Sequence, residues 1–303
     1  MRVLVTGSKG FVGHWLLDHL ESNGDEAVGL DVEADVTDAP AIARAVVRAE
    51  PDAICHLAAQ ASVSASWVDQ PATYTVNTIG AVNVMAAALG CARRPRVLLV
   101  SSSEVYGRVR PSELPVGEDA PFAPVSPYAA SKAAAELAGI QAWLGEGLEV
   151  VRVRPFNHTG PGQRPDFVVP ALAKQVAEAM ASGADALYTG NLDARRDITD
   201  VRDVVRAYRM LLDAGEPGQA YNVCSGTAVS IREVAGRLLR VAGLDLPVIV
   251  DQERVRPVEI PELRGDPSKL HAATGWRPEV DLDQTLADVV GYWKRPAASA
   301  AGR

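Results

Sequence analysis

The sequence predicts an α/β fold: a doubly wound parallel sheet of the Rossmann type, followed by a smaller mixed α/β C-terminal lobe. Three observations lead to this prediction. Short apolar runs alternate with longer helical patterns from the first residue to about residue 155, and the runs 3–5 and 97–100 are continuously apolar. Runs of this kind are typical of parallel strands buried on both faces. A glycine-rich segment also separates the first predicted strand from the first predicted helix.

The elements follow in order along the chain. Strands are expected at 2–6, 27–31, 53–57, 97–101 and 149–154, with helices at 11–21, 39–49, 72–91 and 128–144 between them. Residues 156–170 are rich in Gly, Pro and Asn and predict a loop. Further helices are expected at 169–182, 200–214 and from 231 onward, with strands at 187–189, 220–224 and 248–250. A Pro-rich loop and two helices complete the pattern.

This pattern predicts two lobes and a tail. Residues 1–157, joined by about 198–225, would form a dinucleotide-binding lobe. Residues of about 158–197 and 226–295 would form a smaller lobe over the carboxyl ends of the strands, where open α/β sheets bind ligands. The small and polar residues 296–303 predict a frayed tail.

Composition excludes several classes of protein. The 303 residues are 48% hydrophobic, and the net charge of −8 argues against binding nucleic acid or an anionic membrane through a basic face. Cys55, Cys91 and Cys224 lie far apart, and no pair of histidines has metal-ligand spacing, so we expect neither a disulfide framework nor a metal. No apolar run approaches the roughly 20 residues of a membrane span. We expect a cytoplasmic protein.

The glycine-rich segment predicts a dinucleotide site. Gly7, Gly10 and Gly13 directly follow the first strand and open the first helix, together with Phe11 and Val12. Glycines suit this place because a pyrophosphate must approach the backbone at a helix N-terminus. Gly13 would also let the helix pack closely on the sheet.

Asp31 ends the second predicted strand and bears on the choice of cofactor. Its carboxylate can accept hydrogen bonds from the adenosine ribose and would repel a 2′-phosphate, and no Arg follows until Arg44. The sequence therefore favours NAD(H), with NADP(H) as the alternative. Asp35 and Val36 are expected to form a short third strand beside the adenine. A plain turn residue is the other interpretation of Asp31.

Tyr128 and Lys132 predict acid–base chemistry. Four residues apart on a helix, they share one face, and a nearby ammonium would lower the pKa of the phenol from about 10. Such a tyrosine can exchange a proton with a sugar oxygen. Ser102 and Glu104 follow the strand that ends at Ser101; the serine could bind the reacting oxygen. Glu104 could be a second acid or base, or a polar cap of the strand end.

These motifs together resemble the extended short-chain dehydrogenase/reductases over nearly the whole chain. The glycine segment, His56–Gln60, Asn77–Gly80, Ser101–Gly107 and the Tyr-x-x-x-Lys spacing all match in order. The resemblance implies an enzyme in which the second lobe binds a nucleoside diphosphate sugar. It implies a catalytic set of Ser102, Tyr128 and Lys132, and cofactor contacts from Leu57, Ala58, Ala59 and Asn77. It also places Ser103 and Glu104 beside the substrate.

The later half resembles the branch that reduces GDP-4-keto-6-deoxymannose to a GDP-6-deoxyhexose. The segments that carry this resemblance are 156–163, 190–203, 221–226 and 256–261. The resemblance implies that Asn157 and Gln163 contact the substrate, that Arg196 and Arg256 meet its diphosphate, and that Glu259 meets the nucleotide ribose. Arginine matches phosphate geometry with a fixed fork of donors. Solvated surface charges are the alternative for both arginines.

Several alternatives stay open at this point. Glu104 also resembles the glutamate of sugar-nucleotide 4,6-dehydratases, so a dehydratase or a 4-epimerase with retained NAD is the second interpretation. A non-catalytic NAD sensor is a third. The family resemblance further predicts a homodimer through the helices 72–91 and 128–144, although an Ala-rich helix can equally lie inside a core. We expect His56 to be structural, and for His158 both roles stay open.

Overall fold

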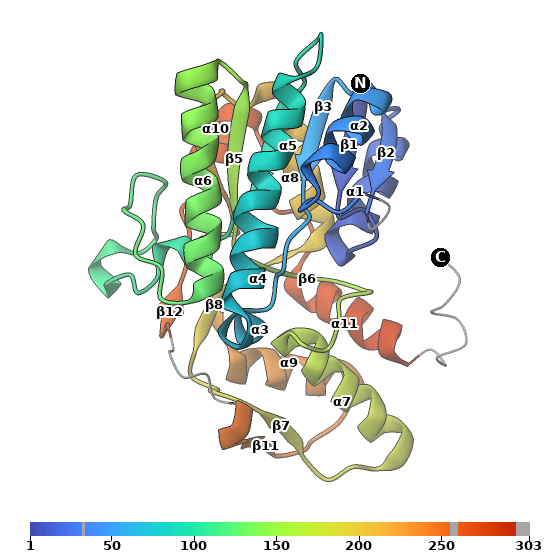
Figure 1. The fold of residues 1–303 in the computed structure, drawn as a ribbon. Coiled ribbons are helices and arrows are strands. Elements are labelled where there is room, and N and C mark those ends of the chain that lie inside the picture. The colour runs from blue at the N-terminus through green and yellow to red at the C-terminus, as the bar shows by residue number, and fades with distance from the viewer. Residues whose placement is uncertain (32–33, 255–259, 295–303) are drawn as a thin grey trace.

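A computed structural model describes residues 1–31, 34–254 and 260–294. A parallel sheet of six strands forms its centre, in the order β2–β1–β3–β4–β5–β9 (Figure 1). These strands are β1 (Arg2–Thr6), β2 (Glu26–Leu30), β3 (Ala53–His56), β4 (Arg96–Val100), β5 (Val150–Pro155) and β9 (Ala220–Val223). Every pairing between them is parallel. The predicted Rossmann-type fold class is confirmed.

Helices cover both faces of this sheet. The helices α1 (Phe11–Ser22) and α8 (Val201–Ala214) pack on one face, and α2 (Ala39–Ala49), α5 (Gly80–Leu89) and α6 (Pro127–Glu146) on the other (Figure 1). Because successive side chains of a strand point to opposite faces, Val3 and Val5 contact the first group and Leu4 the second. This two-sided burial explains why the strands are continuously apolar.

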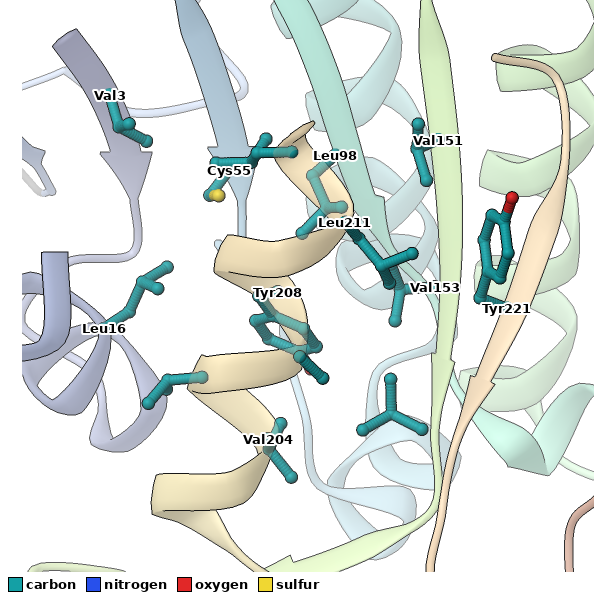
Figure 2. Close-up of a cluster of buried hydrophobic side chains, with 14 of the residues drawn as sticks. Val3, Leu16, Cys55, Leu98, Val151, Val153, Val204, Tyr208, Leu211 and Tyr221 are labelled. Atoms are coloured by element: carbon teal, nitrogen blue, oxygen red, sulfur yellow. The ribbon is translucent and has the colours of Figure 1, made fainter. Parts of the chain in front are cut away.

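An apolar cluster fills the space between the central sheet and the helices α1 and α8. Leu98 and Val153 project from neighbouring strands toward Tyr208, which is 1% exposed (Figure 2). Leu16 of α1 and Leu211 of α8 close the same cluster (Figure 2). A segment some 200 residues from the N-terminus therefore completes the core around β1.

The second lobe lies below the carboxyl edge of the sheet in Figure 1. The strands β6 (Asn157–Thr159), β8 (Arg195–Asp200), β10 (Ala228–Ser230) and β12 (Glu262–Leu263) form one small sheet, and β7 (Leu187–Thr189) pairs with β11 (Val248–Val250). A separate apolar core joins the helices α7 (Val168–Ser182), α9 (Ile231–Ala242) and α11 (Leu282–Trp293). This lobe begins directly where β5 ends.

The chain crosses between the lobes more than once. After β8, both α8 and β9 return to the first lobe, as the predicted two-lobe division requires. The helix α10 (Ser268–Thr274) does the same: its Leu270, with the neighbouring Trp276, lies in the core of the first lobe. We keep the division as a proposal, with α10 counted in the first lobe although it falls within residues 226–295.

Three local predictions differ from the structure. Asp35 and Val36 form a turn rather than a strand, because the Asp35 carboxylate accepts from the backbone N–H of Thr37. The expected loop 156–170 contains β6, which is stabilised by parallel pairing with the distant β8. The expected helix 72–91 is α4 (Gln70–Tyr74), a π-helical turn η1 (Thr75–Ile79) and α5, and it ends at Leu89. Only β6 depends on a distant partner, whereas the turn at Asp35 is closed by a local hydrogen bond.

The strand order locates a ligand site. From β1 the chain goes first to β2 on one side and then to β3 on the other, so β1 and β3 flank the point where the direction of winding reverses. Open α/β sheets bind ligands outside the carboxyl ends of the strands at such a point. The segments after β1 and β3 are Gly7–Gly13 and Leu57–Gln60.

Candidate active site

The turn between β1 and α1 brings backbones too close for side chains. A Cβ at Gly13 would lie 2.3 Å from the carbonyl oxygen of Gly7, and one at Gly7 would lie 2.8 Å from the backbone nitrogen of Ala58. Gly7 also has a φ of +70°, which favours glycine. The N-terminus of α1, from Phe11 onward, therefore lies open beside the loop after β3. This cradle fits the pyrophosphate of a dinucleotide.

Asp31 reaches back over the glycine turn. Its carboxylate accepts from the backbone N–H of Lys9 at 2.8 Å. Val36, predicted to flank the adenine, is 8% exposed and packs against Gly80, where a Cβ would lie 2.7 Å from its Cγ2. The Asp31 carboxylate therefore lies beside the glycine turn, and its role toward the cofactor stays a prediction.

Asn77 ties the loop after β3 to the helix α6. Its side-chain oxygen accepts from the backbone N–H of Gln60 at 2.8 Å, and its amide donates to the Gln60 carbonyl at 3.1 Å and to the Ser131 hydroxyl at 2.9 Å. The predicted cofactor residues Leu57, Ala58 and Ala59 lie in the loop that Asn77 holds. The amide of Asn77 therefore links the loop after β3, on the cofactor side of the site, to α6, which carries Tyr128 and Lys132.

His56 is structural in this arrangement. Its Nδ1 shares a hydrogen bond of 2.8 Å with the hydroxyl of Thr6, and the ring is 3% exposed. Burial, reinforced by the charge of Lys132, lowers the pKa of His56 to about 3. The ring is therefore neutral at physiological pH, in agreement with the expected structural role.

Ser102, Tyr128 and Lys132 come together at the carboxyl end of β4. Ser102 caps the short 3₁₀ helix η2 (Ser103–Tyr106), and its hydroxyl lies near enough to the Tyr128 phenol to lower the pKa of that group. The ammonium of Lys132 donates to the carbonyl of Val100, the last residue of β4, at 2.8 Å. All three are at least nine-tenths buried. The sequence-predicted catalytic set therefore shares one place in the fold.

The pKa of Tyr128 differs from the expectation that Lys132 lowers it. Burial raises this pKa to about 12, since the phenolate would lose its hydration; the Ser102 hydrogen bond lowers it, and the charge of Glu104 raises it further. Lys132 is turned to the carbonyl of Val100, and burial lowers its own pKa to about 8. The phenol is consequently a protonated acid at neutral pH.

Glu104 and Ser103 lie in the turn that follows β4. The backbone N–H of Glu104 donates to the Ser102 hydroxyl at 3.2 Å, and the Glu104 carboxylate lies near enough to Tyr128 to raise its pKa. Ser103 is 3% exposed. Glu104 therefore brings a carboxylate near the phenol, and it also stands in the first turn of η2, so both interpretations of this residue stay open.

The glycine-rich segment after β5 packs against the start of α1. The ring of His158 stacks on Phe11 at 6.3 Å between centroids, and burial lowers its pKa. Gln163 is 6% exposed; its amide accepts from the Thr159 hydroxyl and donates to the carbonyl of His158. Gln163 thus shapes this segment, while the side chain of Asn157 is exposed.

The predicted diphosphate residues are only partly described. Arg196 is 8% exposed and donates to the carbonyls of Arg195 and Ile260 at 2.8 Å, so it fastens β8 to the segment before β12. Arg256 and Glu259 lie outside the described residues. The neighbouring Asp197 is fully buried and accepts from Ser225, Gly226 and Gly265. Sequence reasoning did not single out Asp197.

A buried charge network beside the site was also missed. Glu136 on α6 is 0% exposed and pairs with Arg154 and Arg152 of β5, while Arg154 also meets Tyr106. Two signals in the sequence point to it: a glutamate one turn after Lys132 in an Ala-rich helix, and two arginines in an otherwise apolar strand. Charges in such places are rarely left without partners.

Two kinds of feature are absent from the residues that the structure describes. In the ranges 1–31, 34–254 and 260–294, no three His, Cys, Asp or Glu side chains gather as metal ligands would. Within those same ranges no helix has the length and apolar character of a membrane span.

The fold and the site define an enzyme of the extended short-chain dehydrogenase/reductase class. The chain belongs to the protein family described as GDP-mannose 4,6 dehydratase, which it matches over residues 31–289. It is 37% identical over 297 residues to the GDP-6-deoxy-D-mannose reductase of Pseudomonas aeruginosa, covering 97% of each chain.

Two solved structures are similar over almost the whole chain. The structure of RMD from Pseudomonas aeruginosa complexed with NADPH has a TM-score of 0.90 and 37% identity, covering 97% of this chain and 98% of that one. The Thermus thermophilus UDP-glucose 4-epimerase complex with NAD has a TM-score of 0.88 and 31% identity, covering 97% and 99%.

The glycine cradle generates the first prediction. Replacing Gly13 by Ala places a methyl group against the Gly7 carbonyl, so α1 must move away from the sheet. We expect NADH affinity to fall at least about tenfold, or about 1.4 kcal/mol, in a fluorescence titration. Gly236→Ala on α9 is the control, since nothing lies within 4 Å of its Cβ position. Equal affinity in the two variants would contradict the cradle.

Proposed function

We propose that the protein reduces the 4-keto group of a nucleotide-activated 6-deoxyhexose, with GDP-4-keto-6-deoxymannose as substrate and a GDP-6-deoxyhexose such as GDP-rhamnose as product. The observation that carries the proposal is the phenol of Tyr128, buried and protonated beside Ser102 at the carboxyl end of β4. Reduction of a ketone needs a proton donor at the emerging alkoxide. The similarity to the P. aeruginosa reductase supports this substrate class.

The residues of the site then have distinct tasks. When bound, the reduced nicotinamide supplies the hydride for C4. Tyr128 gives its proton to the C4 oxygen, and the Ser102 hydroxyl holds that oxygen in place. We propose that the Lys132 ammonium, which donates to the Val100 carbonyl in this structure, turns toward Tyr128 and stabilises the phenolate once the proton has been given up. Donors already aligned with the developing negative charge lower the barrier without reorganising during the reaction.

The substrate would lie between the first lobe and the second. We propose that Ser103, Glu104, Asn157 and Gln163 line the sugar end, and that Arg196, Arg256 and Glu259 bind the nucleoside diphosphate. Arg196 is supported by its buried place on β8, and Asn157 by its exposed side chain on β6 beside it. We propose no metal for this site.

The activity itself is tested by absorbance at the reduced-nicotinamide band, with purified protein, NADH and freshly made GDP-4-keto-6-deoxymannose. Stoichiometric loss of NADH with formation of a GDP-deoxyhexose is the expected result. If NADH is not consumed and a cofactor stays with the protein through purification, the reductase proposal fails.

Tyr128→Phe removes the proton donor and leaves the ring. We expect kcat to fall by about 10²–10⁴-fold, because the alkoxide at C4 then lacks its acid. NADH binding should be unchanged by fluorescence titration, since the change removes one oxygen only. Unaltered turnover would rule out this mechanism.

A second candidate function is a 4,6-dehydratase or 4-epimerase that retains its NAD. Glu104 favours it, because a carboxylate stands beside Tyr128 where elimination of water would need a second acid or base. Incubation with nucleotide sugars and no added cofactor distinguishes this candidate from the reductase.

We propose NAD(H) as the preferred cofactor, with NADP(H) accepted less well. One of the similar structures contains NADPH and the other contains NAD, so the fold is compatible with either cofactor. The carboxylate of Asp31, held at the mouth of the glycine turn by Lys9, supports NAD(H). Its charge would repel a 2′-phosphate.

Asp31→Asn removes the negative charge of this side chain but keeps its shape and its hydrogen-bond acceptor. The Asn oxygen can still accept from the Lys9 backbone N–H, but the repulsion of a 2′-phosphate is gone. We expect the ratio of kcat/KM for NADH to that for NADPH to fall by about tenfold, equivalent to about 1.4 kcal/mol. A wild-type preference for NADPH would contradict the proposed role of Asp31.

We propose that the protein is a cytoplasmic homodimer that binds no nucleic acid or membrane. Large apolar side chains are exposed along the adjacent helices η1–α5 and α6 (Figure 1): Ile79, Val82, Leu137 and Leu144 are 39–76% exposed. A second copy of this helix pair would bury them in a four-helix interface.

Leu137→Asp tests the dimer. We expect wild-type protein to sediment at twice the chain mass and the variant to associate at least about tenfold more weakly, because a carboxylate would lose its hydration in the interface. Val47→Asp on α2 is the control, with a similarly exposed valine away from this helix pair. A monomeric wild-type protein would contradict the proposal.

A further inference from the structure

The face of α6 that carries the catalytic tyrosine and lysine continues to a buried carboxylate. Tyr128, Lys132 and Glu136 follow one another at intervals of four residues, so they share one side of the helix. Glu136 is 0% exposed. Its two oxygens accept from Nε of Arg154 at 2.9 and 3.1 Å, and Oε2 also accepts from Nη2 at 2.9 Å. This is a forked pair, the strong form of ion pair.

The third nitrogen of the Arg154 guanidinium, Nη1, points away from α6. Nη1 donates to the Tyr106 hydroxyl and to the carbonyl of Glu118, both at 2.9 Å. The guanidinium also lies over the rings of Tyr106 and Phe122, at 5.0 and 4.9 Å from their centroids. A planar cation between two rings, with donors used on both sides, has little freedom to move.

Tyr106 belongs to the turn that presents the catalytic serine. It is the last residue of η2, and Ser102 is the cap at the other end of that turn. The Tyr106 hydroxyl donates to Asn222 of β9 at 2.6 Å while it accepts from Arg154. Arg154 therefore connects the helix that holds Tyr128 and Lys132 with the turn that holds Ser102 and Glu104.

We infer that Glu136 and Arg154 form a positioning pair for the reaction, which fixes the Ser102 turn against the Tyr128–Lys132 helix. The inference rests on the proposed function, because it concerns the same catalytic set. Neither residue has a direct contact with Ser102 or Tyr128: the pair acts through Tyr106 at one end and through α6 at the other. A misplacement of 1 Å far from the reacting atoms can cost 10²-fold in rate.

The electrostatics of α6 agree with this arrangement. Burial lowers the pKa of Lys132, and the charge of Glu136 opposes that effect. The two arginines around Glu136 in turn stabilise its carboxylate. A change at Glu136 should therefore be visible in the titration of Lys132.

Tyr106→Phe loosens the turn and leaves the ion pair intact. It removes the hydroxyl that meets Arg154 and Asn222 but keeps the ring under the guanidinium. Tyr221→Phe is the matched control: that tyrosine is 2% exposed, and its hydroxyl accepts from the backbone N–H of Glu216 outside the network. We expect Tyr106→Phe to lower kcat by about tenfold, with KM and Tm changed no more than in the control.

Two results would overturn the inference. One is a kcat of Tyr106→Phe equal to that of Tyr221→Phe. The other is a loss of kcat in Tyr106→Phe that only follows a loss of folded protein, measured by circular dichroism.

A second measurement needs no substrate and separates this inference from the proposed function. The chain has five lysines, so NMR of lysine labelled with ¹³C at Cε gives few signals, and a Lys132→Arg variant assigns the one from Lys132. We expect the pKa of Lys132, about 8 in the wild-type chain, to fall in Glu136→Gln, because the neighbouring negative charge is lost.

If wild-type protein does not reduce the 4-keto sugar, the proposed function fails and this titration decides the inference. A lowered pKa of Lys132 then supports the pair, and an unchanged one overturns it. If Glu136→Gln does not fold, Glu136→Asp replaces it; this variant keeps the charge but withdraws it by one methylene, so we expect a smaller fall of the Lys132 pKa.

Discussion

Direct contact between backbones at the end of β1 is the constraint on which the site depends. Where Gly7, Gly13 and Ala58 meet, any Cβ would separate α1 from the sheet. The contact leaves the amino end of α1 beside the loop after β3, which Asn77 fastens to α6. The cofactor side and the acid–base side are thus joined through main chain and one buried amide.

Two of the buried charges lie on α6, the helix that carries the proposed acid–base residues. The helix carries Lys132 and Glu136 in a run of alanines, both hidden from solvent. Each charge has a specific partner: the carbonyl of Val100 for the lysine and the Arg154 fork for the glutamate. Small alanine side chains allow strand and helix to approach closely enough for these contacts. An unpartnered charge in this position would cost several kcal/mol.

The sequence was sufficient for the fold class and for the proximity of Ser102 to the helix of Tyr128 and Lys132, because both follow from local patterns; the catalytic role of these residues stays a proposal. Apolar strands and a glycine turn are short-range signals, and the spacing of Tyr128 and Lys132 puts them on one helical face. Residues that depend on distant partners were not predictable in the same way. β6 exists because it pairs with β8, and Arg154 meets Tyr106 and Glu136 only once the sheet has formed. The direction of the Tyr128 pKa was mistaken for the same reason, since it depends on burial and not on spacing.

The return of α8 to the first lobe has a consequence for biosynthesis. Val3, Val5 and Leu98 face α8, which is translated some 100 to 200 residues later than these strands. Until Tyr208 and Leu211 leave the ribosome, one apolar face of the nascent sheet has no complete cover. Contacts between such distant segments slow folding and prolong the exposure of apolar surface. During that interval the nascent chain is at its most prone to aggregate, and chaperones that hold exposed apolar strands would act on this face.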